Sequence, residues 1–215
     1  MTRAALFDLD GTLTDPKLGI TRSIQYALAK RGRPVPDADS LEPWIGPPLE
    51  QSFREHAGMT PADARQAVDD YREYFAETGL FENAVYPGIA ALLDELGARG
   101  WRLAVATSKP TVFAERILVH FALARHFEAV VGSHLDGGRV DKQELIADAL
   151  AQLAGIARAQ AVHVGDRKHD VLGARANGIT AIAAGWGYGT RAELVAAQPH
   201  ALAESVAALG RLLFV

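Results

Sequence analysis

Short apolar runs and helix-type repeats alternate along most of this chain. Apolar runs with the length and composition of buried strands occur at 4–7, 102–107, 127–131, 161–165 and 179–183. Helix-type spacing of apolar residues precedes each of the last four runs, at 88–99, 110–121, 142–153 and 170–177. This alternation predicts an α/β fold, a doubly wound, Rossmann-like parallel sheet with helices on both faces.

The segment between the first two runs has a different pattern. Apolar residues at helical spacing follow Pro16, a second helical segment covers about 47–57, and Thr60-Pro61-Ala62-Asp63 is typical of a capped helix start. We find no strand pattern from Pro16 to Ala84. We therefore expect an α/β catalytic core at 1–15 and 86–215, and an inserted helical cap at 16–85.

The composition is that of an ordinary soluble protein. The hydrophobic fraction is 49%, the charged fraction is 22%, and the formal net charge is -4, which favours neither a nucleic acid polymer nor a membrane as partner. The absence of cysteine excludes disulfides, thiol nucleophiles and cysteine-ligated metals. No run is long enough to span a membrane, and no leader pattern precedes the first strand. We expect a cytoplasmic enzyme that acts on a small molecule.

Two carboxylates follow the first predicted strand. Asp8 and Asp10 stand one residue apart, before Gly11 and Thr12. Because neighbouring carboxylates repel one another, the pair stays ionised only beside positive charge. Mg²⁺, a hard cation that takes oxygen ligands, suits this need. A polar strand end with an ordinary Asp-Gly turn is the alternative interpretation of this motif alone.

Polar residues also follow later strands. Thr107-Ser108 precedes a helix, where hydroxyl and N–H groups suit an anion or simply cap the helix. Lys142 follows a glycine-rich turn at 137–141 and begins a helix, an unfavourable place for a cation unless an anion lies nearby. Asp166 and Asp170 bracket another turn into a helix and can complete an oxygen shell for a cation. We read Lys168 and His169 as exposed turn residues.

Taken in order, these motifs resemble the haloacid dehalogenase superfamily of phosphohydrolases. The matching residues are Asp8 to Thr12, then Thr107-Ser108, Lys142, and Gly165-Asp166 to Asp170. In finer detail the chain is similar to the phosphoglycolate phosphatase-like branch. The resemblance covers the whole chain and implies the α/β core with an inserted helical cap.

The resemblance also implies roles for these residues. Asp8 would be the nucleophile that carries an aspartyl-phosphate, and Asp10 the acid–base, held in place by Thr12. The phosphate would be bound by Thr12, Thr107, Ser108 and Lys142. Mg²⁺ would be ligated by Asp8, Asp10 through its backbone carbonyl, and Asp166. Asp170 would orient Lys142 or a metal-bound water, and direct contact with the metal stays open.

The implied substrate is a small phosphorylated metabolite, with phosphoglycolate as the first candidate. A 5′-nucleotidase of the same fold and a β-phosphoglucomutase-like phosphomutase remain alternatives. A receiver-type phosphoacceptor module is a weaker one, because its phosphorylated aspartate would follow the third strand. The chain is expected to be a monomer or a homodimer.

Several residues outside the motifs are candidates for contacts with the substrate. Arg22, Arg54 and Arg72 of the cap could bind a substrate carboxylate, although a surface ion pair is the favoured explanation for any one of them. The segment Trp44–Pro48 looks like a rigid loop directed at the core. The segment Trp186–Gly189 either walls the site or packs into the core.

Overall fold

The computed structural model describes residues 2–136 and 138–214. Gly137, part of the glycine-rich turn before Lys142, lies outside the described residues. The chain forms two compact units, one made of Met1–Asp15 with Val85–Val215 and the other of Pro16–Ala84. The second crossing point lies one residue before the boundary expected from the sequence. We call the first unit the core and the second the cap, and describe each separately.

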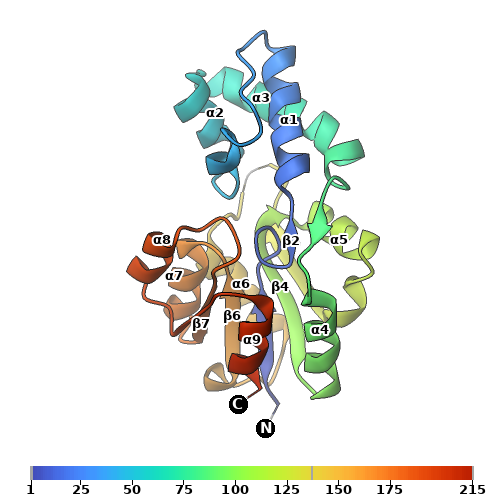
Figure 1. Cartoon of the computed structure of the whole chain (residues 1–215), viewed down its shortest axis with the longest axis vertical. Coiled ribbons are helices and arrows are strands. Elements are labelled where there is room, and N and C mark those ends of the chain that lie inside the picture. Colours follow the sequence, from blue (N-terminus) through green and yellow to red (C-terminus); the bar gives the residue numbers. More distant parts are fainter. Residues whose placement is uncertain (1, 137, 215) are drawn as a thin grey trace. The chain divides into compact units, whose positions relative to one another are not determined.

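The core is built on a six-stranded sheet with the order β5-β4-β1-β6-β7-β8, in which all the described pairs are parallel. Figure 1 shows the chain coloured along the sequence. The strands are β1 (Ala4–Phe7), β4 (Arg102–Pro110), β5 (Ala129–Ser133), β6 (Ala161–Gly165), β7 (Thr180–Ala184) and β8 (Ala201–Ala203). The helices of the core are α4 (Ile89–Ala98), α5 (Thr111–His120), α6 (Lys142–Gln152), α7 (Lys168–Ala176), α8 (Arg191–Ala196) and α9 (Val206–Leu213).

The first strand occupies the centre of this sheet. Strand β1 pairs with β4 on one side, where Phe7 stands opposite Val105, and with β6 on the other, where Phe7 stands opposite Val164. The chain thus builds outward from β1 in both directions. In such sheets ligands bind at the carboxyl ends of the strands, where the strand order reverses. That position here is the end of β1, just before Asp8.

Alternate side chains of the central strands pack on opposite sides of the sheet. Ala4 and Leu6 of β1 belong to a buried apolar cluster that also contains Leu145 and Ile146 of α6 and Val171 of α7. Helices α4 and α5 contact β4, and α9 contacts α4. Helices α4 and α9 lie in front of the sheet in Figure 1. The sheet is therefore layered between helices, which confirms the predicted doubly wound α/β class.

The structure differs from the sequence-based elements in two places. Strand β4 runs through Pro110, past the predicted end at 107, with a register irregularity between Ala106 and Pro110. Such irregularities redirect side chains. The sheet also continues beyond β7 into β8, which is too short to give a sequence pattern. The segment Trp186–Gly189 therefore lies in the connection between β7 and β8.

The cap is helical, as its sequence pattern predicts. Its helices are α1 (Lys17–Lys30), α2 (Leu49–Ala57) and α3 (Pro61–Tyr74), with a short 3₁₀ turn at Glu42–Trp44 and a π-helical turn at Phe75–Gly79. The Thr60 side chain accepts a hydrogen bond from the N–H of Asp63, which is the expected helix cap. Two short strands, β2 (Thr14–Asp15) and β3 (Ala84–Val85), pair with each other where the chain passes between the units.

Candidate active site

The sheet brings the predicted motif residues together at the carboxyl ends of three neighbouring strands. Asp8 directly follows β1, Thr107 lies in the irregular end of β4, and Asp166 directly follows β6. Lys142 is the first residue of α6, and Asp170 lies in the first turn of α7. Because β1 lies between β4 and β6, all five residues surround the end of one strand.

Lys142 links two of the carboxylates. Its Nζ lies 3.1 Å from Oδ2 of Asp8 and 2.9 Å from Oδ1 of Asp170, and its residue is only 6% exposed. Burial disfavours the charged ammonium, but the charges of Asp170 and Asp8 outweigh it and raise the pKa of Lys142. The unfavourable position of this lysine at a helix start therefore has local anions that explain it.

Asp8 is held from two sides. The backbone N–H of Leu9 donates to Oδ1 at 2.8 Å, while Lys142 contacts Oδ2. Burial raises the pKa of Asp8, and the charge of Lys142 and a hydrogen bond from Thr107 oppose that rise. The carboxylate thus has a fixed orientation, which suits a group that must attack along one line.

Of the three clustered carboxylates, Asp166 has the least positive charge beside it to offset its burial. It is 1% exposed, and none of the described Lys or Arg residues forms an ion pair with it. Burial, followed by the charges of Asp170 and Asp8, raises the pKa of Asp166 to about 8. Its oxygens accept hydrogen bonds from the N–H of Tyr188 at 2.8 Å and from the Thr12 hydroxyl at 3.4 Å. The expectation that Thr12 holds Asp10 is therefore not met, since its hydroxyl points to Asp166.

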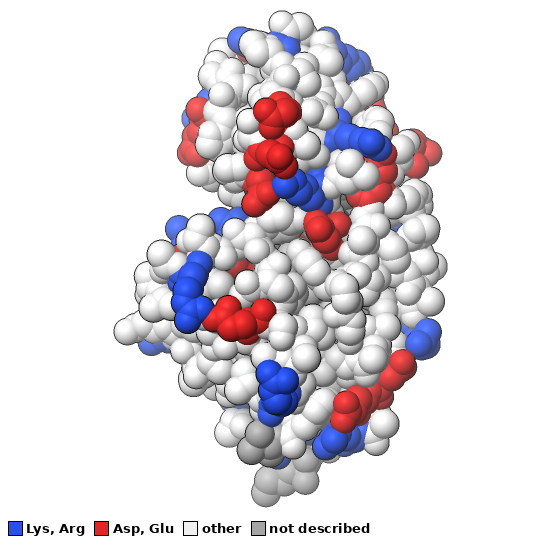
Figure 2. Space-filling view, viewed as in Figure 1, with Lys and Arg blue, Asp and Glu red and all other residues white. Residues whose placement is uncertain are grey.

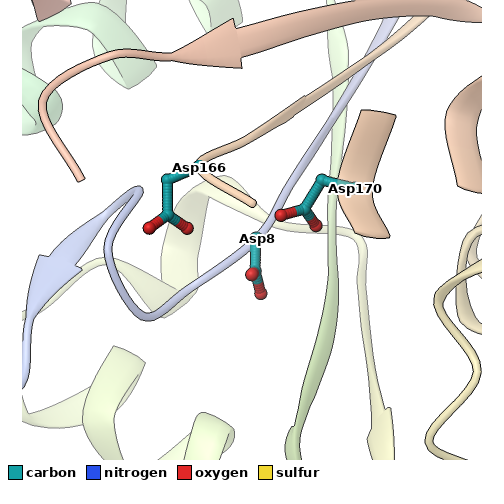
Figure 3. Close-up of side chains that lie close together, drawn as sticks. All are labelled: Asp8, Asp166 and Asp170. Atoms are coloured by element: carbon teal, nitrogen blue, oxygen red, sulfur yellow. The ribbon is translucent and has the colours of Figure 1, made fainter. Parts of the chain in front are cut away.

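Three of these carboxylates could hold a metal ion. Asp8, Asp166 and Asp170 each offer an oxygen, and these oxygens lie within 4.8 Å of one another. Figure 3 shows the three side chains projecting from different segments toward the same region. An all-oxygen donor set suits a hard cation such as Mg²⁺. Three carboxylates lie beside the single ammonium group of Lys142, and a bound cation would offset the remaining negative charge. The donor chemistry therefore fits the expected magnesium ion.

The hydrogen bonds of Asp170 indicate how it acts in this cluster. Oδ1 contacts Lys142 at 2.9 Å and Nε2 of His163 at 3.1 Å, while Oδ2 accepts from the N–H of Arg167 at 3.0 Å. Both oxygens thus already have protein partners. These contacts hold Asp170 beside Lys142, so that the carboxylate can orient the ammonium group.

Asp10 lies apart from the three clustered carboxylates. Its Oδ2 forms an ion pair with Nζ of Lys109, and its Oδ1 has no hydrogen-bond partner among the described residues. Lys109 is one of the residues that the sequence analysis did not single out. It stands two positions after Thr107, in the irregular end of β4, where the redirected backbone brings it to Asp10.

Thr107 and Ser108 make different contacts. Thr107 is 1% exposed, hydrogen bonds to Asp8, and accepts from the N–H of Lys109 at 3.3 Å. The Ser108 hydroxyl donates to the carbonyl of Val140 at 3.4 Å. The Thr107 side chain therefore faces the carboxylate cluster, whereas the Ser108 side chain braces the turn before Lys142.

Glycines allow the surrounding loops to approach the aspartates closely. A Cβ on Gly11, whose φ is +77°, would lie 2.2 Å from Oδ2 of Asp166, and one on Gly187 would lie 2.4 Å from Cβ of Asp166. The indole N–H of Trp186 donates to the carbonyl of Thr12 at 3.1 Å. The segment Trp186–Gly189 thus walls the site, which was one of the two roles considered for it.

The candidate cationic residues of the cap have partners or lie exposed within that unit. Arg22 forms an ion pair with Glu82, and Arg72 lies 3.8 Å from Asp69. Arg54 is exposed. In the same unit, the Trp44 ring packs edge-on against Phe53 at 5.6 Å between centroids. Contacts of these residues with a substrate stay predictions.

The surface charge and the helix lengths bear on whether a nucleic acid or a membrane could be a partner. On the face shown in Figure 2, Lys and Arg side chains of the described residues are interspersed with Asp and Glu side chains, without a large basic patch. Among the described helices, none is both long and apolar enough to cross a membrane.

The sequence and the fold are similar to those of known proteins. A family model for haloacid dehalogenase-like hydrolases matches residues 5–184. The chain is 52% identical to a 5′-nucleotidase of Pseudomonas aeruginosa, over 97% of this chain and 94% of the relative. Its structure is similar to a predicted phosphatase from Clostridium acetobutylicum, with a TM-score of 0.91 and 45% identity over 99% of this chain and 98% of that one.

Other relatives carry different activities in their names. The structure of protein tyrosine kinase A from Mycobacterium tuberculosis matches with a TM-score of 0.86 and 40% identity, over 100% of this chain and 99% of that one. A phosphoglycolate phosphatase of Pseudomonas savastanoi is 30% identical, over 87% of this chain and 71% of the relative. The relatives thus share the fold and differ in the activities named.

Proposed function

This chain belongs to the haloacid dehalogenase-like hydrolases, and on that premise we propose that it is a Mg²⁺-dependent phosphatase that cleaves small phosphomonoesters through an aspartyl-phosphate on Asp8. One observation supports the proposal most strongly. Lys142 lies within ion-pair distance of both Asp8 and Asp170, beside a third carboxylate, Asp166. Phosphoryl transfer through a covalent intermediate needs a fixed carboxylate as nucleophile, and an ammonium group and a cation to stabilise the charge on the phosphoryl oxygens.

In the first proposed step, an Asp8 oxygen attacks the phosphorus and forms a P–O bond while the bond to the leaving oxygen breaks. Asp10 gives a proton to that leaving oxygen. Lys142 stabilises the negative charge on the phosphoryl oxygens, and the hydroxyl of Thr107 donates to one of them. Both groups lie beside Asp8 in the structure.

In the second step, water attacks the same phosphorus, Asp10 accepts its proton, and the bond to Asp8 breaks to release phosphate. Asp8, Asp166 and the Asp10 carbonyl would hold Mg²⁺, with Asp170 orienting Lys142. When bound, the ion would offset the repulsion between the carboxylate nucleophile and a phosphate dianion.

We propose nucleoside 5′-monophosphates as the first substrate class to test. The 5′-nucleotidase relative, at 52% identity and nearly full length, supports this class more strongly than the phosphoglycolate phosphatase relative at 30% supports phosphoglycolate. Phosphoglycolate, the first expectation from the sequence, therefore becomes the second candidate. A phosphomutase activity of the β-phosphoglucomutase kind remains a prediction of the sequence without further support.

The test is phosphate release by the purified full chain. The panel contains nucleoside 5′-monophosphates, 2-phosphoglycolate, β-glucose 1-phosphate and p-nitrophenyl phosphate, each with Mg²⁺ and with excess chelator. We expect Mg²⁺-dependent release that Asp8→Asn abolishes. Asp94→Asn is the matched control, because Asp94 is 60% exposed and its surface ion pair should contribute little.

The outcomes test the substrate, the type of reaction and the mechanism separately. Preference for phosphoglycolate would overturn the substrate and keep the mechanism. Isomerisation of glucose 1-phosphate without phosphate release would favour the mutase. Activity that survives in Asp8→Asn would contradict the aspartyl-phosphate mechanism itself.

A further inference from the structure

A buried imidazole ring projects from a central strand of the sheet, close to the candidate active site. His163 is the middle residue of β6, pairs in register with Leu6 on one side and Ala181 on the other, and is 1% exposed. Its neighbours in the strand are Val162 and Val164. A polar side chain in a buried apolar strand is uncommon and asks for a reason.

Only one of the two ring nitrogens has a hydrogen-bond partner among the described residues. Nε2 lies 3.1 Å from Oδ1 of Asp170, whereas Nδ1 is buried and has no hydrogen-bond partner among the described residues. A buried nitrogen without a partner costs stability in either tautomer. An apolar residue would avoid that cost, so packing alone does not account for a histidine at this position.

We propose that His163 is a positioning residue, which fixes Asp170 and, through it, holds Lys142 against Asp8. This inference rests on the proposed function, because it assigns a role in that same site. The contacts run in one line. His163 Nε2 lies 3.1 Å from Asp170 Oδ1, this oxygen lies 2.9 Å from Lys142 Nζ, and that nitrogen lies 3.1 Å from Asp8 Oδ2.

The geometry of Asp170 explains why a second support is needed. The N–H of Arg167 holds Oδ2, which anchors one end of the carboxylate. Oδ1 is shared by His163 and Lys142. With His163 absent, Oδ1 would be held by Lys142 alone, and the flexible lysine side chain would lose a fixed counter-charge. Groups that orient a residue touching the substrate are commonly worth a tenfold change or more in activity.

The experiment compares three variants. His163→Leu removes the N–H donor and keeps an apolar side chain, whereas His163→Gln retains an N–H donor at about the same reach. His126→Leu is the matched control. The His126 side chain is only 7% exposed, and its Nε2, like Nδ1 of His163, is buried without a hydrogen-bond partner among the described residues. It lies in the turn Ala124–His126 beside Asp94, and no described hydrogen bond or ion pair joins it to a residue of the site.

The first readout is kcat on the best substrate of the panel, together with the midpoint of thermal unfolding. We expect His163→Leu to lower kcat by about tenfold or more without lowering the midpoint below that of His163→Gln. His163→Gln should recover kcat to within about threefold of the wild type, and His126→Leu should leave it unchanged. Wild-type kcat in His163→Leu, or an equal loss in Leu and Gln, would overturn the proposal.

The second readout does not depend on activity. The ¹⁵Nζ resonance of Lys142, assigned by its absence in Lys142→Met, reports whether the buried ammonium keeps its partners. We expect this resonance to shift or broaden in His163→Leu and to stay unchanged in His163→Gln and His126→Leu. An unchanged resonance in His163→Leu would contradict the role of His163, whether or not the protein hydrolyses a panel substrate. Absence of hydrolysis of every panel substrate by the wild type would instead count against the proposed function.

Discussion

Lys109, at the end of β4, and Asp10, in the loop that follows β1, form a partly buried ion pair. Nζ of Lys109 lies 2.5 Å from Oδ2 of Asp10, and the lysine side chain is 6% exposed. The other oxygen of Asp10 has no partner among the described residues. The ion pair therefore holds Oδ2, and under the proposed function Oδ1 would be the oxygen that exchanges a proton with the substrate.

Lys109→Met should lower kcat by at least about tenfold, because acid–base catalysis depends on the placement of the carboxylate. The free energy of unfolding should fall by about 1.5–3 kcal/mol, the usual contribution of hydrogen bonds to charged groups. Steady-state kinetics and urea unfolding measure the two effects. Lys109→Arg is the control, since it keeps a cation beside Asp10. A kcat equal to that of the wild type in Lys109→Met would argue against this role.

Gly187→Ala should damage the site through steric conflict. The added Cβ would lie 2.3 Å from the carbonyl oxygen of Gly11 and 2.4 Å from Cβ of Asp166. Forcing these groups apart should cost about 1–3 kcal/mol and should lower activity. Thermal unfolding and phosphate release measure both effects.

Gly97→Ala is the matched control for that substitution. Gly97 lies within α4, and a Cβ there would meet nothing within 4 Å. We expect a gain of about 0.5–1 kcal/mol from the better helix propensity of alanine, with full activity. Equal effects of the two substitutions would contradict the close packing around Asp166.

Mg²⁺ should stabilise the folded protein. A ligand that binds only the native state adds about 2.7 kcal/mol when its concentration is a hundred times its Kd. Since Asp166 is the buried carboxylate without a described ion-pair partner, Asp166→Asn should abolish the rise in unfolding midpoint on adding Mg²⁺. Glu115→Gln, at an exposed position of α5, is the control. A rise that survives in Asp166→Asn would exclude Asp166 from the metal site.

The cap should contain a pH-dependent ion-pair cluster. Asp70 is 6% exposed and receives hydrogen bonds from Lys30 at 2.8 Å and Arg31 at 2.6 Å. Burial opposes ionisation of Asp70, but these two partners outweigh it and lower its pKa below the usual value. Stability from this group is therefore present above about pH 4 and is lost as the pH falls through the lowered pKa.

Asp70→Asn tests this dependence. At pH 7 the variant should be about 1–3 kcal/mol less stable than the wild type, because it loses the charged hydrogen bonds. The difference should shrink as the pH falls toward 3, since the wild-type carboxyl group then also loses its charge. Urea unfolding across this pH range measures the difference. A difference that stays constant with pH would mean that Asp70 acts through packing alone.

The fold class and the order of the motifs could be read from the sequence because both are local. Strand and helix periodicity needs only neighbouring residues, and the pairing of parallel strands then carries Asp8, Thr107 and Asp166 to one edge of the sheet. The short β8 escaped prediction because three residues give too little periodicity.

The sequence by itself thus determined the α/β class, the helical character of the inserted segment and the set of carboxylates beside Lys142. Only the tertiary structure decided which group each side chain contacts. Thr12 contacts Asp166, 154 positions away, and Lys109 contacts Asp10, 99 positions away. His163 looks like one more residue of a buried strand until α7 places Asp170 beside it. Such partners depend on backbone irregularities, close glycine contacts and packing between distant segments, which no local pattern of residues encodes.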